Sequence, residues 1–166
     1  MLTMKKIAFI LVALMMSVAA NAQFEKGKAY IGASLTNLDL SYNGLREGHF
    51  GLGGKMGYMV ADDLLLTGQV AYEKQKDVPY QLSFGVGGRY YIVQNGLYVG
   101  LSGNYKHSEG YSDVLPSVQL GYALFLNGSV TVEPEIYYEQ SFKNHKDYST
   151  VGLRLGIGVY LFGNNK

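Results

Sequence analysis

The sequence predicts an all-β fold, an eight-stranded antiparallel up-and-down transmembrane β-barrel. Apolar and polar residues alternate with a period of two in most of the chain, and no segment after the N-terminus sustains a period of 3.6. Twenty-two glycines, fifteen tyrosines and no tryptophan are typical of a twisted β protein with aromatic belts. An even number of sequential antiparallel strands closes most simply as a barrel, which leaves no sheet edge exposed.

A secretory signal peptide is predicted at residues 1–22, and the barrel domain at residues 23–166. Two lysines precede an apolar run at residues 7–16, and the A-x-A ending Ala20-Asn21-Ala22 favours cleavage before Gln23. The apolar run is too short for a transmembrane helix, which needs about 20 apolar residues. The sequence therefore predicts an exported protein.

Charge and cysteine content restrict the partners. Removing the two lysines of the leader leaves 12 basic and 13 acidic residues, a net charge of −1. Without a basic excess or a basic run, nucleic acid is not expected as a partner. The chain has no cysteine, so it has neither a disulfide framework nor a lipidated N-terminal cysteine.

Eight segments carry the alternating pattern, and the 144 residues after residue 22 allow about 18 residues for each strand with its connection. The predicted strands are residues 28–42, 50–60, 64–73, 80–92, 97–106, 114–124, 130–142 and 151–161. Short turns at 61–63, 94–96 and 127–128 alternate with longer loops at 43–48, 76–79, 108–113 and 143–148. The first strand changes phase near Thr36–Asn37, which indicates a bulge or an early end.

The segment 130–142 shows the alternation most clearly. One face carries Val130, Val132, Pro134, Ile136 and Tyr138, and the other carries three glutamates. Over the whole barrel, charged residues gather on this second face: Lys55, Glu73, Arg89, Lys106, Glu133, Glu135, Glu139 and Arg154. An apolar face pointing inward would make a soluble lipocalin-like barrel, with an outside unusually poor in charge. An apolar face pointing outward would meet lipid and enclose four positive and four negative side chains.

Aromatic residues on the apolar face favour the membrane alternative. They fall at the two ends of the strands, near the short turns and near the longer loops: Phe50, Tyr58, Tyr72, Tyr80, Tyr90, Tyr105, Tyr122 and Phe142. Two aromatic rings at opposite ends are the interfacial girdles of a membrane barrel. We expect both termini in the periplasm and four short loops outside.

The inner charges predict a packed polar core, because an eight-stranded barrel is just wide enough for its side chains to fill. Counting along the last hairpin places Tyr137 opposite Arg154, with Glu135 and Glu139 diagonal to it. Arg89 lies at the height of Glu133. Lys106 and Glu73 lie near the loop end. The alternative is a narrow gated pore, opened when an arginine changes its glutamate partner.

The signal peptide, the eight alternating strands and the last strand, Gly152 to Phe162, resemble the small OmpA/OmpX-like outer membrane β-barrels, an outer membrane protein beta-barrel domain. The resemblance implies a place in the outer membrane of a Gram-negative cell, contact with outer membrane lipid, and insertion by the barrel-assembly machinery. That machinery reads a terminal aromatic residue, for which Phe162 is the candidate, although four residues follow it. We expect a monomer without cofactor or metal.

A lipid-modifying enzyme is the third alternative, since some small barrels of this kind modify lipid A. The deacylase type places a histidine and a serine two residues apart on the lipid face. None of the histidines 49, 107 and 145 has a serine at that spacing, and Ser108 points away from His107 in a regular strand. No histidines or carboxylates recur at metal-ligand spacing. The predicted role is structural, or an interaction through the short loops, with the loop partner undefined; no enzyme is expected.

Overall fold

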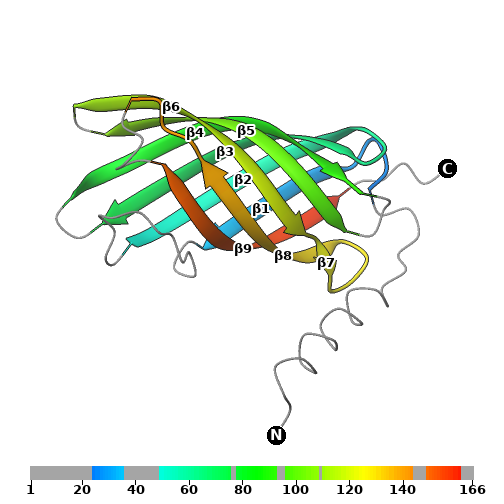
Figure 1. Ribbon diagram of the computed structural model, residues 1–166. Helices are drawn as coiled ribbons and strands as arrows, with labels where there is room; N and C mark the ends of the chain where they lie inside the picture. Colours follow the sequence, from blue (N-terminus) through cyan, green and yellow to red (C-terminus); the bar gives the residue numbers. More distant parts are fainter. Residues whose placement is uncertain are drawn as a thin grey trace, which may run out of the picture.

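The computed structural model describes residues 24–35, 49–75, 78–92, 96–108, 110–143 and 149–161. Its regular elements are all strands, arranged side by side around one barrel (Figure 1). Their bounds are β1 Ala29–Leu35, β2 His49–Ala61, β3 Leu64–Gln75, β4 Val78–Tyr91, β5 Leu97–Ser108, β6 Tyr111–Tyr122, β7 Leu124–Phe125, β8 Val130–Glu139 and β9 Thr150–Leu161. The described part of the chain contains no helix long and apolar enough to cross a membrane.

The sheet closes on itself through antiparallel pairs. Each strand from β1 to β5 pairs with the next, β8 pairs with β9, and β9 pairs with β1. β6 and the two-residue β7 both pair with β8 and are separated only at Ala123, so together they form one wall of the barrel. The predicted eight-stranded antiparallel barrel is therefore confirmed.

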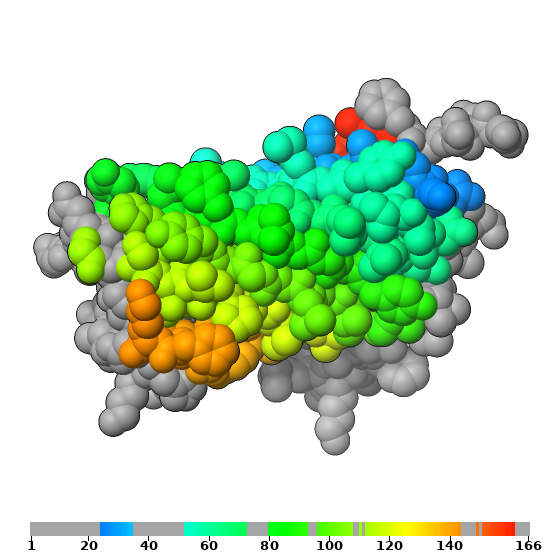
Figure 2. Space-filling model, turned by 90° about the horizontal axis from the view of Figure 1, so that it is seen from above, coloured from blue at the N-terminus to red at the C-terminus, as the bar shows by residue number. Residues whose placement is uncertain are grey.

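The apolar face of the barrel points outward. Val86, Met56 and Leu101 expose 73%, 68% and 67% of their surface, whereas Leu115, one residue from the exposed Val114, is buried. In the space-filling view β3 to β6 make one continuous outer wall (Figure 2). A soluble barrel would bury these side chains, so their exposure is that of a barrel whose outside meets hydrocarbon.

Two predicted loops are wrong because their hairpins are tighter than the polar residues suggested. Val78 pairs with Gln75, so the predicted loop 76–79 is reduced to residues 76 and 77 and β4 begins at Val78. Ser108 pairs with Tyr111, which leaves two residues in place of the predicted loop 108–113. Gly110 has a φ of +81° there, a conformation that glycine adopts without strain.

The other strand bounds differ by a few residues. β1 is described over Ala29–Leu35, and the rest of the predicted strand 28–42, with the expected bulge near Thr36–Asn37, lies outside the described residues. β8 ends at Glu139, three residues before the predicted end, and Gln140 still donates its backbone amide to Pro116 of β6. The predicted signal peptide, the loop 43–48 and Phe162 lie outside the described residues.

Candidate functional site inside the barrel

Arg89 is buried in the barrel interior. It projects from β4 and donates from Nη1 to Glu133 Oε2 at 2.7 Å and from Nη2 to Glu135 Oε2 at 3.0 Å, both glutamates lying on β8. Its guanidinium carbon lies 4.2 Å from the centre of the Tyr98 ring, and its side chain is 4% exposed. The Arg89 guanidinium thus connects β4 to β8 across the interior by charge-assisted hydrogen bonds, which are strong where water is scarce.

Hydroxyl groups complete the coordination of the two glutamates. Tyr30 donates to Glu133 Oε2 at 2.8 Å, and Thr131 donates to its Oε1 at 2.9 Å. Tyr98 donates to Glu135 Oε2 at 2.9 Å. Each carboxylate oxygen therefore has a donor, which is the condition under which buried charge is tolerated. The contacts from Tyr30 and Tyr98 could not be predicted from the sequence, because they join strands far apart in the chain, whereas Thr131 and Glu133 lie two residues apart on β8.

Arg154 extends the network from β9. Its Nη1 donates to Glu135 Oε1 at 2.9 Å, and its guanidinium carbon lies 4.2 Å from the centre of the Tyr137 ring. The expected register, with Tyr137 opposite Arg154, is wrong. Glu135 is opposite Arg154, and Tyr137 pairs with Gly152. The register of a hairpin depends on where its loop begins and ends, which the alternation alone does not show.

A second group of polar side chains lies toward the loop end of the barrel. Lys106 donates to Glu139 Oε2 at 3.0 Å, and Asn104 donates to Glu139 Oε1 at 2.9 Å. Asn104 also accepts from Gln69. Nearer the loops, Ser141 donates to Asp113 at 2.6 Å. The side chain of Glu73 is not among those described, so its place in this group is untested.

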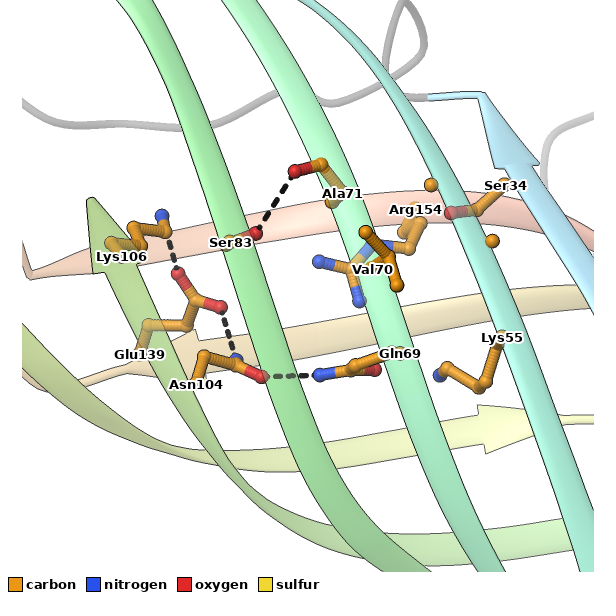
Figure 3. A pocket seen from close by; sticks show the side chains of 12 residues that line it. Ser34, Lys55, Gln69, Val70, Ala71, Ser83, Asn104, Lys106, Glu139 and Arg154 are labelled. Atoms are coloured by element: carbon orange, nitrogen blue, oxygen red, sulfur yellow. Dashed lines mark hydrogen bonds and ion pairs between the residues drawn. The ribbon is translucent and has the colours of Figure 1, made fainter. Parts of the chain in front are cut away.

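Two small cavities remain between these groups. The larger, about 40 Å³, lies among Lys55, Gln69, Lys106, Glu139 and Arg154 (Figure 3). The smaller, about 20 Å³, lies toward Arg89 and Glu133, and both are lined by Ser34, Lys55 and Arg154. A water molecule needs about 10–15 Å³ of such space, so the larger cavity has room for about three waters and the smaller for about one.

An aromatic plug fills the end of the interior near the short turns. Its buried members pack against one another: Phe24, Tyr30, Met59, Leu65, Tyr91, Tyr98, Ala123 and Tyr160. The Phe24 ring is fully buried and stacks on Tyr91, with ring centroids 3.8 Å apart and planes 11° apart. The inner face provides the room, since a Cβ at Gly121 would overlap the Tyr98 ring.

The segment that carries Phe24 is held by its backbone. Asp63 donates its amide to the Phe24 carbonyl at 2.8 Å, and Gly27 donates to Met59 at 2.9 Å. The Lys26 amide donates to the Asp62 carboxylate at 2.9 Å. No role was predicted for Phe24. The available signal is a lone aromatic residue in the second position after the predicted cleavage site.

The predicted girdle residues are distributed along the outer surface. Exposed fractions are 52% for Tyr58, 53% for Tyr90, 44% for Tyr72, 60% for Tyr80, 45% for Tyr105 and 77% for Phe142. Tyr122 is half-buried, and the Phe50 side chain lies outside those described. Tyr72 and Tyr80 stack on each other across β3 and β4 with centroids 6.3 Å apart. Phe142 lies beyond the end of β8.

His107 and Ser112 meet on the outer face near the loops. They are opposite each other in the β5–β6 ladder, and His107 Nδ1 lies 3.0 Å from Ser112 Oγ. Lys143 donates to the backbone carbonyl of Ser112. This pair could not be found by looking for a serine two residues after a histidine, because the two residues lie on neighbouring strands. Among the described residues, no three histidines and carboxylates come together as a metal site would require.

An outward apolar wall, a closed ladder and a charged interior define a transmembrane β-barrel of the outer membrane. The chain belongs to the outer membrane protein beta-barrel domain family, which it matches over residues 8–166. The family places the protein in the outer membrane, as the sequence predicted. A comparison with curated proteins finds no match.

Solved structures of small outer membrane barrels share the fold. The N-terminal β-barrel domain of Pseudomonas aeruginosa OprF is 14% identical, with a TM-score of 0.62 over 82% of this chain and 98% of that domain. Pseudomonas aeruginosa OprG is 16% identical, with a TM-score of 0.54 over 85% of this chain and 99% of that one. Neisserial surface protein A is 16% identical, with a TM-score of 0.53 over 80% and 95%. At these identities the likeness shows the fold alone.

Proposed function

We propose that this protein is a closed outer membrane barrel whose role is structural, or an interaction made through its short external loops. The observation that supports this proposal is the Arg89 bridge to Glu133 and Glu135, which crosses the interior with every carboxylate oxygen satisfied. The aromatic plug lies beneath it. The ionic and aromatic layers lie one above the other, and the two cavities found between the described side chains are about 40 and 20 Å³, so this interior does not favour transport.

The loops are the surface left for a partner. A rigid barrel that presents loops at one end is an arrangement on which binding residues commonly lie. The chemistry of the partner that binds the loops is undefined. The barrel wall contacts a different partner, outer membrane lipid, which would also fill an apolar groove of about 890 Å³ on the outer wall. Gly54, Gly68 and Gly103 line that groove, and a Cβ on any of them would meet nothing within 4 Å.

Recordings in planar bilayers test the closed state. The purified protein should show no conductance steps, while a known porin in the same preparation serves as the positive control. Regular steps from the wild-type protein would contradict the proposal.

A narrow gated pore is the second candidate. Two cavities that share the lining residues Ser34, Lys55 and Arg154 favour it. The cavities follow one another from the loop-end group toward Arg89 without being connected. A change of partner by Arg154, from Glu135 to Glu139, would join them. Steps in the wild type that change in Glu139→Ala would establish this function; steps absent from both proteins would exclude it.

Biogenesis completes the proposal. Residues 1–22 are removed as a signal peptide, the barrel-assembly machinery inserts the chain, and the protein acts as a monomer without cofactor. Cleavage before Gln23 places Phe24 second in the mature chain, next to the plug that it joins. N-terminal sequencing of the outer membrane form tests this cleavage, and light scattering in detergent tests the monomer.

A further inference from the structure

Lys55 differs from the other basic side chains of the inner face. Arg89, Lys106 and Arg154 each have a glutamate oxygen within 3.0 Å. Lys55 has no ion pair or hydrogen bond from its side chain among the described residues. In Figure 3 its ammonium points toward Gln69, and no interaction joins it to any residue drawn. An ammonium group in a barrel interior is costly unless a partner compensates the loss of water.

The cavity beside Lys55 has an excess of positive charge. Lys55, Lys106 and Arg154 line it, and Glu139 is its only acidic lining residue among the described side chains. Glu139 already accepts from Lys106 and Asn104. Over the described interior, four basic groups face four buried acids, Asp113, Glu133, Glu135 and Glu139. The positive excess is local to the cavity, where three basic groups meet one glutamate, and the field there favours an anion over a cation.

The size and the remaining lining of the cavity restrict the ligand. A volume of about 40 Å³ is a few times what one water needs, so it accommodates a single small ion with little hydration. Ser34, Ser83, Gln69 and Asn104 add neutral hydrogen-bonding groups to the wall. A nucleotide, a sugar or a sulfate with its hydration shell does not fit in this space.

We propose that this cavity binds a small monovalent anion, of halide or formate size, held by the Lys55 ammonium with Arg154 beside it. Glu135 acts on Lys55 only from beyond ion-pair distance, and the anion supplies the direct contact that no described glutamate makes with Lys55. This inference does not depend on the loops or on whether the barrel conducts. The polar side chains around this cavity would then bind a ligand in addition to stabilising the barrel.

Bromide provides a direct probe. Crystals of the wild-type protein, grown in detergent and soaked in sodium bromide, should show an anomalous bromine peak within hydrogen-bonding distance of Lys55 Nζ. Crystals of Lys55→Met should lack that peak. Lys26→Met is the matched control, because Lys26 is exposed and outside the barrel strands. An ordered water in place of bromine, or a peak that persists in Lys55→Met, would overturn the proposal.

A solution measurement separates a specific site from binding at crystal concentration only. A ligand that binds only the folded state raises the unfolding midpoint as its concentration increases. Replacing sulfate by bromide at constant ionic strength should raise the midpoint of the wild type and of Lys26→Met. The midpoint of Lys55→Met should not change when bromide replaces sulfate. If Lys55→Met fails to fold, Lys55→Gln is measured in its place. Equal responses in all variants would show a general salt effect and reject the site.

Discussion

Arg89 on β4 and Glu133 on β8 form an ion pair of 2.7 Å across the interior of the barrel. The two residues are 44 positions apart, and both side chains are almost fully buried, at 4% and 3% exposed. The pair joins walls that make no backbone contact with each other. It therefore links the two halves of the barrel wall independently of the hydrogen-bonded ladder.

Removal of Arg89 should be strongly destabilising. Arg89→Met leaves Glu133 and Glu135 without their shared cation, and breaking a buried ion pair on one side costs about 3–5 kcal/mol. Urea unfolding in lipid vesicles, followed by tyrosine fluorescence and gel mobility, measures the change. Replacing Glu133 by Gln in the same chain should recover part of the loss. A loss below about 1 kcal/mol, the range of exposed ion pairs, would mean that the bridge is not formed in the membrane.

Truncation of Phe24 tests the aromatic plug. Phe24→Ala removes a fully buried ring stacked on Tyr91 and should lower the free energy of unfolding by about 3–5 kcal/mol. Phe142→Ala is the control, because Phe142 is 77% exposed and should tolerate truncation far better. Equal effects of the two substitutions would show that the N-terminal segment does not enter the barrel.

The outward face can be tested with one charge. Leu155→Arg places a guanidinium on the outer face in the middle of β9 and should cost about 2–4 kcal/mol if that position lies at the bilayer midplane. Leu126→Arg is the matched control, because Leu126 is exposed in the turn between β7 and β8. Folding into vesicles gives both values. A neutral Leu155→Arg would indicate that this wall faces water.

His107 and Ser112 provide a test for catalysis. A serine nucleophile with a histidine base would require a third group to orient the histidine and donors for the developing oxyanion. We expect the hydrogen bond to hold the end of the β5–β6 hairpin without chemistry. Mass spectra of lipid A should be identical in cells that express the wild type, Ser112→Ala or no protein. A lipid A species that appears with the wild type and disappears with Ser112→Ala would make the protein an enzyme.

The alternation of residues along one strand was the most informative signal in the sequence. At residues 130–138 it predicted which side chains face lipid and which face the interior, and β8 follows that prediction residue by residue. It failed at the hairpin ends, where Val78, Pro79 and Tyr111 belong to strands. Polar residues there indicated loops, but a ladder continues for as long as the backbone groups of two strands remain paired.

The strand number, the outward apolar wall and the set of inner charges could be predicted from the sequence, because they depend on a local period of two that each strand displays alone. The partners inside the barrel depend on the tertiary structure. It places Glu135 between Arg89 and Arg154, inserts Phe24 beneath them and leaves Lys55 beside a cavity. These relationships depend on closure and register, which bring residues of distant strands to the same height, and no local pattern encodes that distance.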